Sequence, residues 1–186
     1  LSTTAELNCT IKVLSGHGQF DKTCATRITY EGIRALVDTP QQVDKRDAQW
    51  LIPSTLPSRV FKDQEANGEY WFLWADIDKD PPGLRAVEQA VESATEMFSC
   101  YEIYTTRSAT EDCQKCRIII PLGKPLSGSD WKLSQECLND MLEHLDIIPD
   151  RANERCAQLC YLPNKGAFYD SISNRDGNYF EPLSHW

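Results

Sequence analysis

The sequence predicts a mixed α/β (α+β) domain, part of which has the split-βαβ order of strands and helices. One aromatic-rich run has the composition of a buried strand, two later segments carry apolar residues at helical spacing, and three further apolar runs have strand composition. In chain order these are a strand at 69–78, a helix at 84–98, strands at 101–108 and 116–122, a helix at 129–145 and a strand at 157–164.

Each of these segments has its own signal. "EYWFLWADID" is a strand by aromatic density, and it ends at "DPPG", whose prolines cannot donate to a ladder. "LRAVEQAVESATEMF" spaces its apolar residues as an amphipathic helix does. The second helix takes Ser129 or Asp130 as its cap. The last strand is "AQLCYLPN", and the tail at 177–186 is expected to be irregular. The resulting order is that of split-βαβ folds, among them the RNA-recognition motif.

The N-terminal part is less regular. Residues 11–20 and 25–38 predict short strands around glycine turns, followed by a short helix. Residues 46–70 contain prolines and an Asn-Gly pair, so this segment is expected to be rich in loops. We therefore expect residues 1–69 to form an N-terminal lobe or flanking layer on a split-βαβ half at 70–186, within one compact unit.

Composition limits the classes of function. The 186 residues include 28 acidic and 19 basic ones, giving a formal net charge of −9, which argues against coating nucleic acid through bulk charge. A local basic groove beside an acidic metal site is compatible with this balance. No apolar run has transmembrane length and no signal-peptide pattern is present, so a cytoplasmic protein without membrane contact is expected. Because the chain begins at Leu1, we expect it to be the N-terminal part of a longer protein.

The first strand of the split-βαβ half ends in two acids, Asp76 and Asp78. Residues i and i+2 of a strand point to the same side, so these carboxylates share a face while Ile77 points to the core. Two like charges on one face repel unless a cation lies between them. Their oxygens suit Mg²⁺ or Mn²⁺, which also take oxygens from substrate phosphates. For this pair alone, a solvated turn continuing into Asp80-Pro81 is the alternative.

Four segments together resemble a known family. "ADID", "YTTRSAT", "CRIIIPLGKPL" and "DRANERCAQLCYLPNKGAFY" follow the order and approximate spacing of phage- and plasmid-type primase-polymerases of the archaeo-eukaryotic primase superfamily. The resemblance extends from about Glu69 to Tyr169. It implies a DNA primase or DNA polymerase activity that uses Mg²⁺ or Mn²⁺, a single-stranded DNA template, a primer and nucleoside triphosphates. It also implies a role in replication of a phage, plasmid or similar element, and a helicase domain C-terminal to this chain.

The resemblance also implies which acids hold the metal ions. Asp76 and Asp78 correspond to the first motif of the family, which binds the catalytic divalent ions. The third motif supplies another acidic residue, for which Asp150 is the candidate and Asp146 the second choice.

The second motif departs from the family pattern. It usually ends in a histidine that contacts the phosphates of the incoming nucleotide, but this chain reads Ser108-Ala109-Thr110. We expect Arg107 to contact the phosphates instead, with Ser108 beside it, because a guanidinium fork matches phosphate oxygens. A subgroup that never used the histidine, a compromised activity and an engineered substitution are the alternatives.

Three further polar residues are candidates for nucleotide contacts. Arg117 opens an apolar strand, where it can meet a triphosphate or form a strand-end salt bridge. Lys165 lies in a glycine-containing loop that can bring its charge to template or triphosphate, although exposed lysines are common. Gln158 can contact a base or sugar edge, or satisfy a backbone group.

The cysteines and aromatic residues offer rival sites. Cys113, Cys116, Cys156 and Cys160 have the residue type and pair spacing of a structural zinc site, but alternation within an apolar strand favours separate reduced thiols. Bases stack on aromatic side chains, and Phe168 and Tyr169 are the best candidates for that contact.

Template-directed nucleotidyl transfer is therefore the predicted function. A non-catalytic single-stranded nucleic-acid-binding module of the RNA-recognition type is one alternative, and it requires exposed aromatic residues on the central strands. A metal-dependent nuclease using the same carboxylates is the other.

Overall fold

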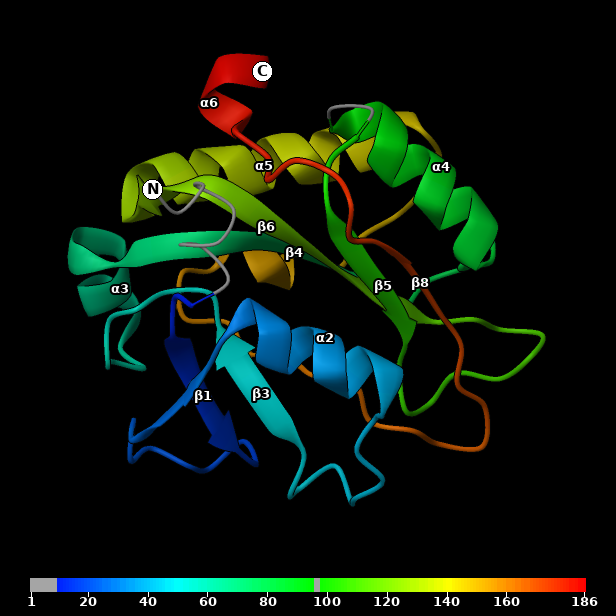
Figure 1. The fold of residues 1–186 in the computed structure, drawn as a ribbon, viewed down its shortest axis with the longest axis horizontal. Coiled ribbons are helices and arrows are strands. Elements are labelled where there is room, and N and C mark those ends of the chain that lie inside the picture. The colour runs from blue at the N-terminus through cyan, green and yellow to red at the C-terminus, as the bar shows by residue number, and fades with distance from the viewer. Residues whose placement is uncertain (1–9, 96–97) are drawn as a thin grey trace.

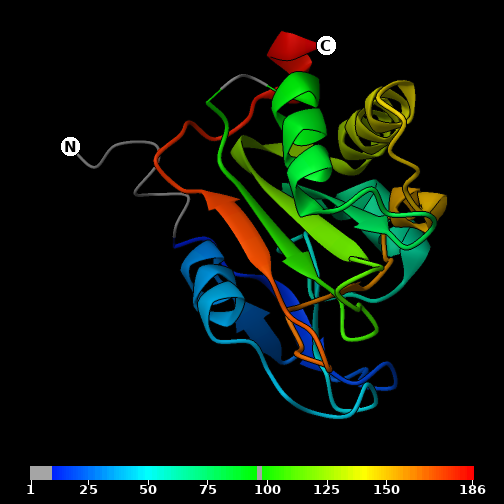
Figure 2. The ribbon, with the colours of Figure 1, turned by 90° about the vertical axis from the view of Figure 1, so that its right-hand side faces the viewer.

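The computed structural model describes residues 10–95 and 98–186, which build two four-stranded sheets with helices around them. Helices α4 and α5 lie on one side of the second sheet, and the first sheet with helix α2 lies on its other side (Figures 1 and 2). This confirms the mixed α+β class.

The first sheet is antiparallel and has the strand order β2-β1-β3-β7. Its strands are β1 (Val13–His17), β2 (Thr26–Ile28), β3 (Gln49–Ile52) and β7 (Cys160–Tyr161), and helix α2 (Tyr30–Asp38) follows β2. Thr29 caps α2 by accepting a hydrogen bond from the backbone N–H of Gly32 at 3.1 Å. The sheet therefore joins segments from both sides of residue 69.

The second sheet has the order β4-β6-β5-β8 and is also antiparallel. Its strands are β4 (Glu69–Ile77), β5 (Tyr101–Thr105), β6 (Cys116–Ser127) and β8 (Ser171–Asn174). The register places Arg117 of β6 between Asp76 of β4 and Tyr104 of β5. Three side chains of the predicted site region thus lie across one face of the sheet.

The helices complete the layers. They are α3 (Phe61–Asn67), α4 (Leu84–Ala94), α5 (Gly128–His144), α6 (Pro182–His185) and the 3₁₀ turn η1 (Arg151–Glu154). Tyr70 of β4 stacks on Trp131 of α5, with ring centroids 4.4 Å apart, and the indole N–H of Trp131 donates to the carbonyl oxygen of Phe72 at 2.8 Å. These contacts fasten α5 along β4.

Several predictions about individual elements were wrong. Only Cys160–Tyr161 of the strand predicted at 157–164 is extended, and it pairs with β3; β8 occupies the edge of the second sheet instead. The strand is short because it pairs with β3 only at Cys160 and Tyr161, which lie opposite Leu51 and Trp50. Two residues later, Pro163 has no N–H with which to continue a ladder. The loop-rich segment at 46–70 contains β3 and α3, and the tail forms α6.

Two helix boundaries also differ from the prediction. The helix expected at 84–98 ends at Ala94, and residues 96 and 97 lie outside the described residues, as do residues 1–9 of the predicted N-terminal lobe. Helix α5 begins at Gly128 because Ser127, not Ser129 or Asp130, is its cap: the Ser127 hydroxyl accepts from the N–H of Asp130 at 3.2 Å. Among the helices that the structure describes, none is long and apolar enough to cross a membrane.

Candidate active site

The site begins where β4 ends. Ile77, the last residue of β4, is fully buried, while Asp76 and Asp78 on either side of it belong to the opposite face. Asp76 is largely buried between the two sheets, and half of the Asp78 side chain is exposed. The alternation predicted from the sequence therefore separates one core residue from two acids on a single face.

Arg117 holds one oxygen of Asp76. Its Nε and Nη2 both donate to Asp76 Oδ2, at 3.0 and 2.8 Å. The other oxygen, Asp76 Oδ1, is buried and has no hydrogen-bond partner among the described residues. A buried carboxylate oxygen without a partner is costly, so this atom is suited to a ligand that brings positive charge.

Burial and neighbouring charges shift the pKa of Asp76. Burial raises the pKa of the Asp76 carboxyl, and the negative charges of Asp78 and Asp150 raise it further. The Arg117 guanidinium acts against them and lowers this pKa, but burial is the largest effect. A divalent cation beside Asp76 would favour its ionised form.

Asp150 lies beside the acid pair in the fold. Its backbone N–H donates to the carbonyl oxygen of Asp76 at 2.8 Å, which attaches the start of η1 to the end of β4. The Asp150 carboxylate caps η1 by accepting from the N–H of Ala152 at 3.0 Å. Asp146, the second choice, lies in the turn after α5, where its N–H donates to the carbonyl oxygen of Glu143.

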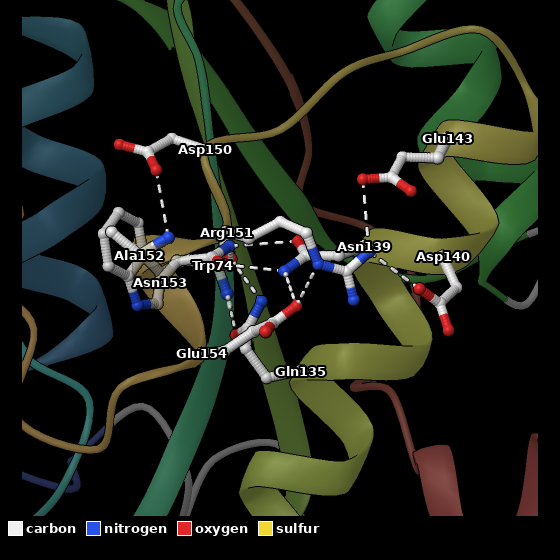
Figure 3. Close-up of polar contacts among 10 residues, drawn as sticks. All are labelled: Trp74, Gln135, Asn139, Asp140, Glu143, Asp150, Arg151, Ala152, Asn153 and Glu154. Atoms are coloured by element: carbon white, nitrogen blue, oxygen red, sulfur yellow. Dashed lines mark hydrogen bonds and ion pairs between the residues drawn. The ribbon is translucent and has the colours of Figure 1, made fainter.

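A buried amide network holds Asp150 in this position (Figure 3). Asn153 donates to the carbonyl oxygen of Trp74 at 2.8 Å and exchanges hydrogen bonds with Asn139 of α5, at 2.7 and 3.1 Å. Gln135 of α5 contacts the same β4 residue twice: it donates to the carbonyl oxygen of Trp74 at 2.7 Å and accepts from its N–H at 3.2 Å. The turn that carries Asp150 is thus tied to both β4 and α5.

Arg151 reinforces this attachment from the surface (Figure 3). Its guanidinium reaches Asp140 and Glu143 of α5, at 2.8 and 3.1 Å, and Glu154 of η1 at 2.6 Å. Glu154 also accepts from Asn139 at 2.9 Å, so the ion pairs and the amide network form one unit. This set of contacts, which no short sequence pattern indicated, supports the acidic edge of the site.

A pocket of about 340 Å³ opens beside the acids. Three cations line it together with Asp78: Lys45 from the loop before β3, Arg107 from the turn after β5, and Arg117 from β6. The wall also includes Thr106, Ser108 and the ring of Tyr161. This concentration of cations is local, because the formal net charge of the whole chain is −9. The cations favour an anionic ligand, and the neighbouring acids favour a ligand that also binds a metal ion.

The turn after β5 brings Arg107 and Ser108, two of the candidates for nucleotide contacts, to the lining of this pocket. Both side chains are exposed, and Arg107 donates to the carbonyl oxygen of Val43. Ala109, where the family motif would have its histidine, is buried and is not among the residues lining the pocket. The position that departs from the family pattern is thus buried, unlike its neighbours Arg107 and Ser108, which line the pocket.

Lys165 and Gln158 line neighbouring hollows rather than the main pocket. Lys165 borders a second pocket that shares Arg107 with the first. Gln158 borders another, which shares Lys45 and Tyr161 with the first. The sequence did not identify Lys45 and Tyr161 as pocket residues. Lys45 precedes β3 in a loop without periodicity, and Tyr161 lies in an apolar segment with the composition of an ordinary strand.

The residues present fit a divalent cation in part. The orphaned Oδ1 of Asp76 and the half-exposed carboxylate of Asp78 supply hard oxygen ligands, and a phosphate in the pocket would supply more. Among residues 10–95 and 98–186, no three Cys, His, Asp or Glu side chains already form a metal-binding group. Binding at Asp76 and Asp78 thus needs ligands from the substrate or a rotation of Asp150, whose carboxylate caps η1.

The cysteines of the proposed zinc site have separate surroundings. Cys160 lies 3.9 Å from the hydroxyl of Tyr104, whereas Cys156 faces the carbonyl oxygen of Gly128 at the start of α5. Burial raises the pKa of the Cys116 and Cys160 thiols to about 12, which favours their protonated form. These are the properties of buried thiols.

The predicted stacking residues are only partly available. Phe168 is half-buried, and the hydroxyl of Tyr169 donates to the carbonyl oxygen of Val37 at 2.7 Å, packing its ring against the core. A base contact at the Tyr169 ring would require it to leave this packing, whereas part of Phe168 remains accessible.

Comparison with known proteins agrees with the architecture. No protein-family model and no curated protein sequence matches the chain. Among solved structures, the chain is similar to the AEP domain of a primase-polymerase from cyanophage S-2L, with a TM-score of 0.53 and 9% sequence identity. The match covers 97% of this chain and 90% of that chain. At this identity the similarity concerns the fold alone, and it agrees with the predicted primase-like fold.

Proposed function

We propose that this chain is a template-directed nucleotidyltransferase, a DNA primase, a DNA polymerase or both. The observation that carries the proposal is the end of β4: Asp78 lines a pocket together with three cations, and one of them, Arg117, also binds Asp76. Asp76 Oδ1 is buried without a hydrogen-bond partner among the described residues. The fold similarity to a primase-polymerase domain and the four motif segments support the same function.

In this proposal, Asp76 and Asp78 hold Mg²⁺ or Mn²⁺, and Asp150 lies close enough to contribute its charge. The bound ions would lower the pKa of the hydroxyl at the primer end and offset charge on the triphosphate. Arg107, Arg117 and Lys45 neutralise the phosphates as negative charge shifts to the leaving group.

The rest of the predicted setting belongs to the proposal as well. The template is a single DNA strand, the substrates are nucleoside triphosphates, and Lys165 and Gln158 contact nucleic acid or nucleotide from the flanking hollows. Replication of a phage, plasmid or similar element is the proposed role, with a helicase domain following this chain as a further partner.

One alternative function is disfavoured by burial. A binding module of the RNA-recognition type needs exposed aromatic residues on its central strands. Here Phe72, Trp74, Tyr101 and Tyr104 are all at most 3% exposed. The sheet face that such a module would present is covered by the first sheet and by helices.

A labelled primer annealed to a longer template tests the proposal. With Mn²⁺ or Mg²⁺ and deoxynucleoside triphosphates, the primer is expected to grow, and EDTA is expected to stop its growth. Shortening of the primer without nucleotides would identify a metal-dependent nuclease instead. Binding of DNA that ignores EDTA, with the primer unchanged under every condition, would leave a non-catalytic binding module.

A further inference from the structure

Phe20 is exposed on a turn whose backbone is fixed by side-chain hydrogen bonds. It is 78% exposed, in the loop between β1 and β2. Nη1 of Arg59 donates to the carbonyl oxygens of Gln19 and Asp21, the residues on either side of Phe20, at 2.9 and 2.6 Å. The chain thus clamps both neighbours of an aromatic ring that remains in solvent.

Two further contacts fix the same turn. The indole N–H of Trp50 donates to the carbonyl oxygen of Gly18 at 2.7 Å, and Gly18 has a φ of +72°, a conformation that favours glycine. The guanidinium of Arg59 lies 4.9 Å from the centre of the Trp50 ring, in a cation–π contact. Because the backbone on both sides of Phe20 is already fixed by hydrogen bonds, a contact between this ring and another molecule would cost little further ordering of the chain.

The position of Phe20 indicates what that contact is. Phe20, Arg59 and Gln158 line a hollow whose wall also includes Lys45 and Tyr161, and these last two line the pocket beside the acids as well. The hollow beside Phe20 and the pocket beside Asp78 therefore share part of one wall. Its cations have the sign that a phosphate backbone requires.

We propose that Phe20 is a stacking platform for a base of single-stranded nucleic acid, and that Lys45 contacts the adjoining phosphate. The strand follows the wall shared by the two hollows toward Asp78. An aromatic ring next to cations is the combination that binds single strands without sequence preference. This inference rests on the proposed function only for the identity of the strand, which is the template.

Binding of a fluorescently labelled oligodeoxythymidine, measured by anisotropy in EDTA without nucleotides, tests the inference. Phe20→Ala is expected to weaken binding about tenfold, the order of one lost base stack, while Phe20→Trp retains the wild-type affinity. Phe98→Ala is the matched control. Phe98 is likewise an exposed phenylalanine, at 68%, but it is not among the residues lining these hollows, so its replacement should leave binding unchanged. Thermal unfolding of each variant confirms that it is folded.

The salt dependence separates the two roles. Lys45→Ala is expected to reduce the slope of log affinity against log salt by about 0.7, the value for one phosphate contact on a single strand, whereas Phe20→Ala leaves that slope unchanged. Equal affinities of the wild type and Phe20→Ala, or a wild type that does not bind the oligonucleotide, would overturn the inference.

These outcomes are distinct from failure of the proposed function. The binding assay contains no metal and no nucleotide, so its outcome does not depend on whether Asp76 and Asp78 hold divalent ions. Binding that depends on Phe20, together with a wild type that never extends a primer, would reject the transferase and retain the stacking platform.

Discussion

Arg117 and Asp76 face each other across β6 and β4, and both donated hydrogen bonds end on one carboxylate oxygen, Asp76 Oδ2. The pair leaves Asp76 Oδ1 buried and without a partner among the described residues. Arg117 thus stabilises the acid in the folded chain while one oxygen stays available to a cation. The Arg117 guanidinium also lines the pocket, so it can pair with Asp76 and contact a phosphate bound in the pocket.

Replacing Arg117 with methionine should affect both stability and substrate binding. It leaves Asp76 as an unpaired, largely buried carboxylate, which costs about 3 kcal/mol in the free energy of unfolding. The KM for the nucleoside triphosphate should also rise. Urea unfolding and steady-state primer extension measure the two effects. Arg117→Lys should recover part of the stability but little of the KM, because an ammonium lacks the guanidinium fork. A methionine variant with unchanged KM would remove Arg117 from the phosphate contacts.

Asn153 is expected to act through the position of Asp150. Asn153→Ala deletes its hydrogen bonds to Trp74 and Asn139 and should cost about 1–3 kcal/mol of stability. It should also raise the Mn²⁺ concentration needed for half-maximal primer extension. Gln64→Ala is the matched control, because Gln64 is a fully buried amide in α3 that donates to the carbonyl oxygens of Leu56 and Ser58. If both variants shift the metal requirement equally, the effect reflects stability alone.

A histidine at position 109, where primase-polymerase motifs usually carry one, should not help catalysis in this chain. Ala109 is 2% exposed, so a histidine there overfills a packed site and should destabilise the fold by about 1–3 kcal/mol. Arg107→Ala, by contrast, removes a cation that lines the pocket and should raise the KM for the nucleotide without comparable loss of stability. Thermal unfolding and primer extension of both variants provide the check. An Ala109→His variant that is stable and more active would show that the pocket accepts a side chain from that position.

The attachment of α2 and the segment of β8 to β5 should depend on a buried carboxylate, that of Glu102. Glu102 is fully buried and accepts hydrogen bonds from Tyr30 of α2, Ser173 of β8 and Arg175. Arg175→Met removes the charge that balances it and should lower the free energy of unfolding by about 3–5 kcal/mol. The exposed pair between Lys124 and Glu181 supplies the control, because Lys124→Met should change stability by less than about 1 kcal/mol. Equal effects in urea unfolding would contradict the importance of Glu102.

Local pattern was sufficient to predict β4 and the shared face of its two acids. Alternation in "WADID" separates Ile77 from Asp76 and Asp78 whatever the rest of the fold is. The family resemblance predicted that Asp150 lies near Asp76 and Asp78. The hydrogen bond from its backbone N–H to the carbonyl oxygen of Asp76 agrees with that position.

Relationships set by tertiary register could not be read from the sequence. Arg117 meets Asp76 only because β6 pairs with β4 in one particular alignment. The segment around Tyr161 is too short to identify its own sheet, and packing assigns it to β3 rather than to β4. Lys45 and Phe20 lie in loops, where no periodicity indicates which side chain reaches a pocket.

A crystal structure with Mn²⁺ and a non-hydrolysable deoxynucleoside triphosphate would show whether Asp76 and Asp78 hold a metal ion beside the substrate phosphates. We expect an anomalous manganese peak that contacts Asp76 Oδ1, Asp78 and a phosphate oxygen, with the triphosphate against Arg107 and Arg117. Crystals in which Asp76 Oδ1 remains without a cation at saturating Mn²⁺ and nucleotide, or in which the nucleotide binds away from this pocket, would contradict it.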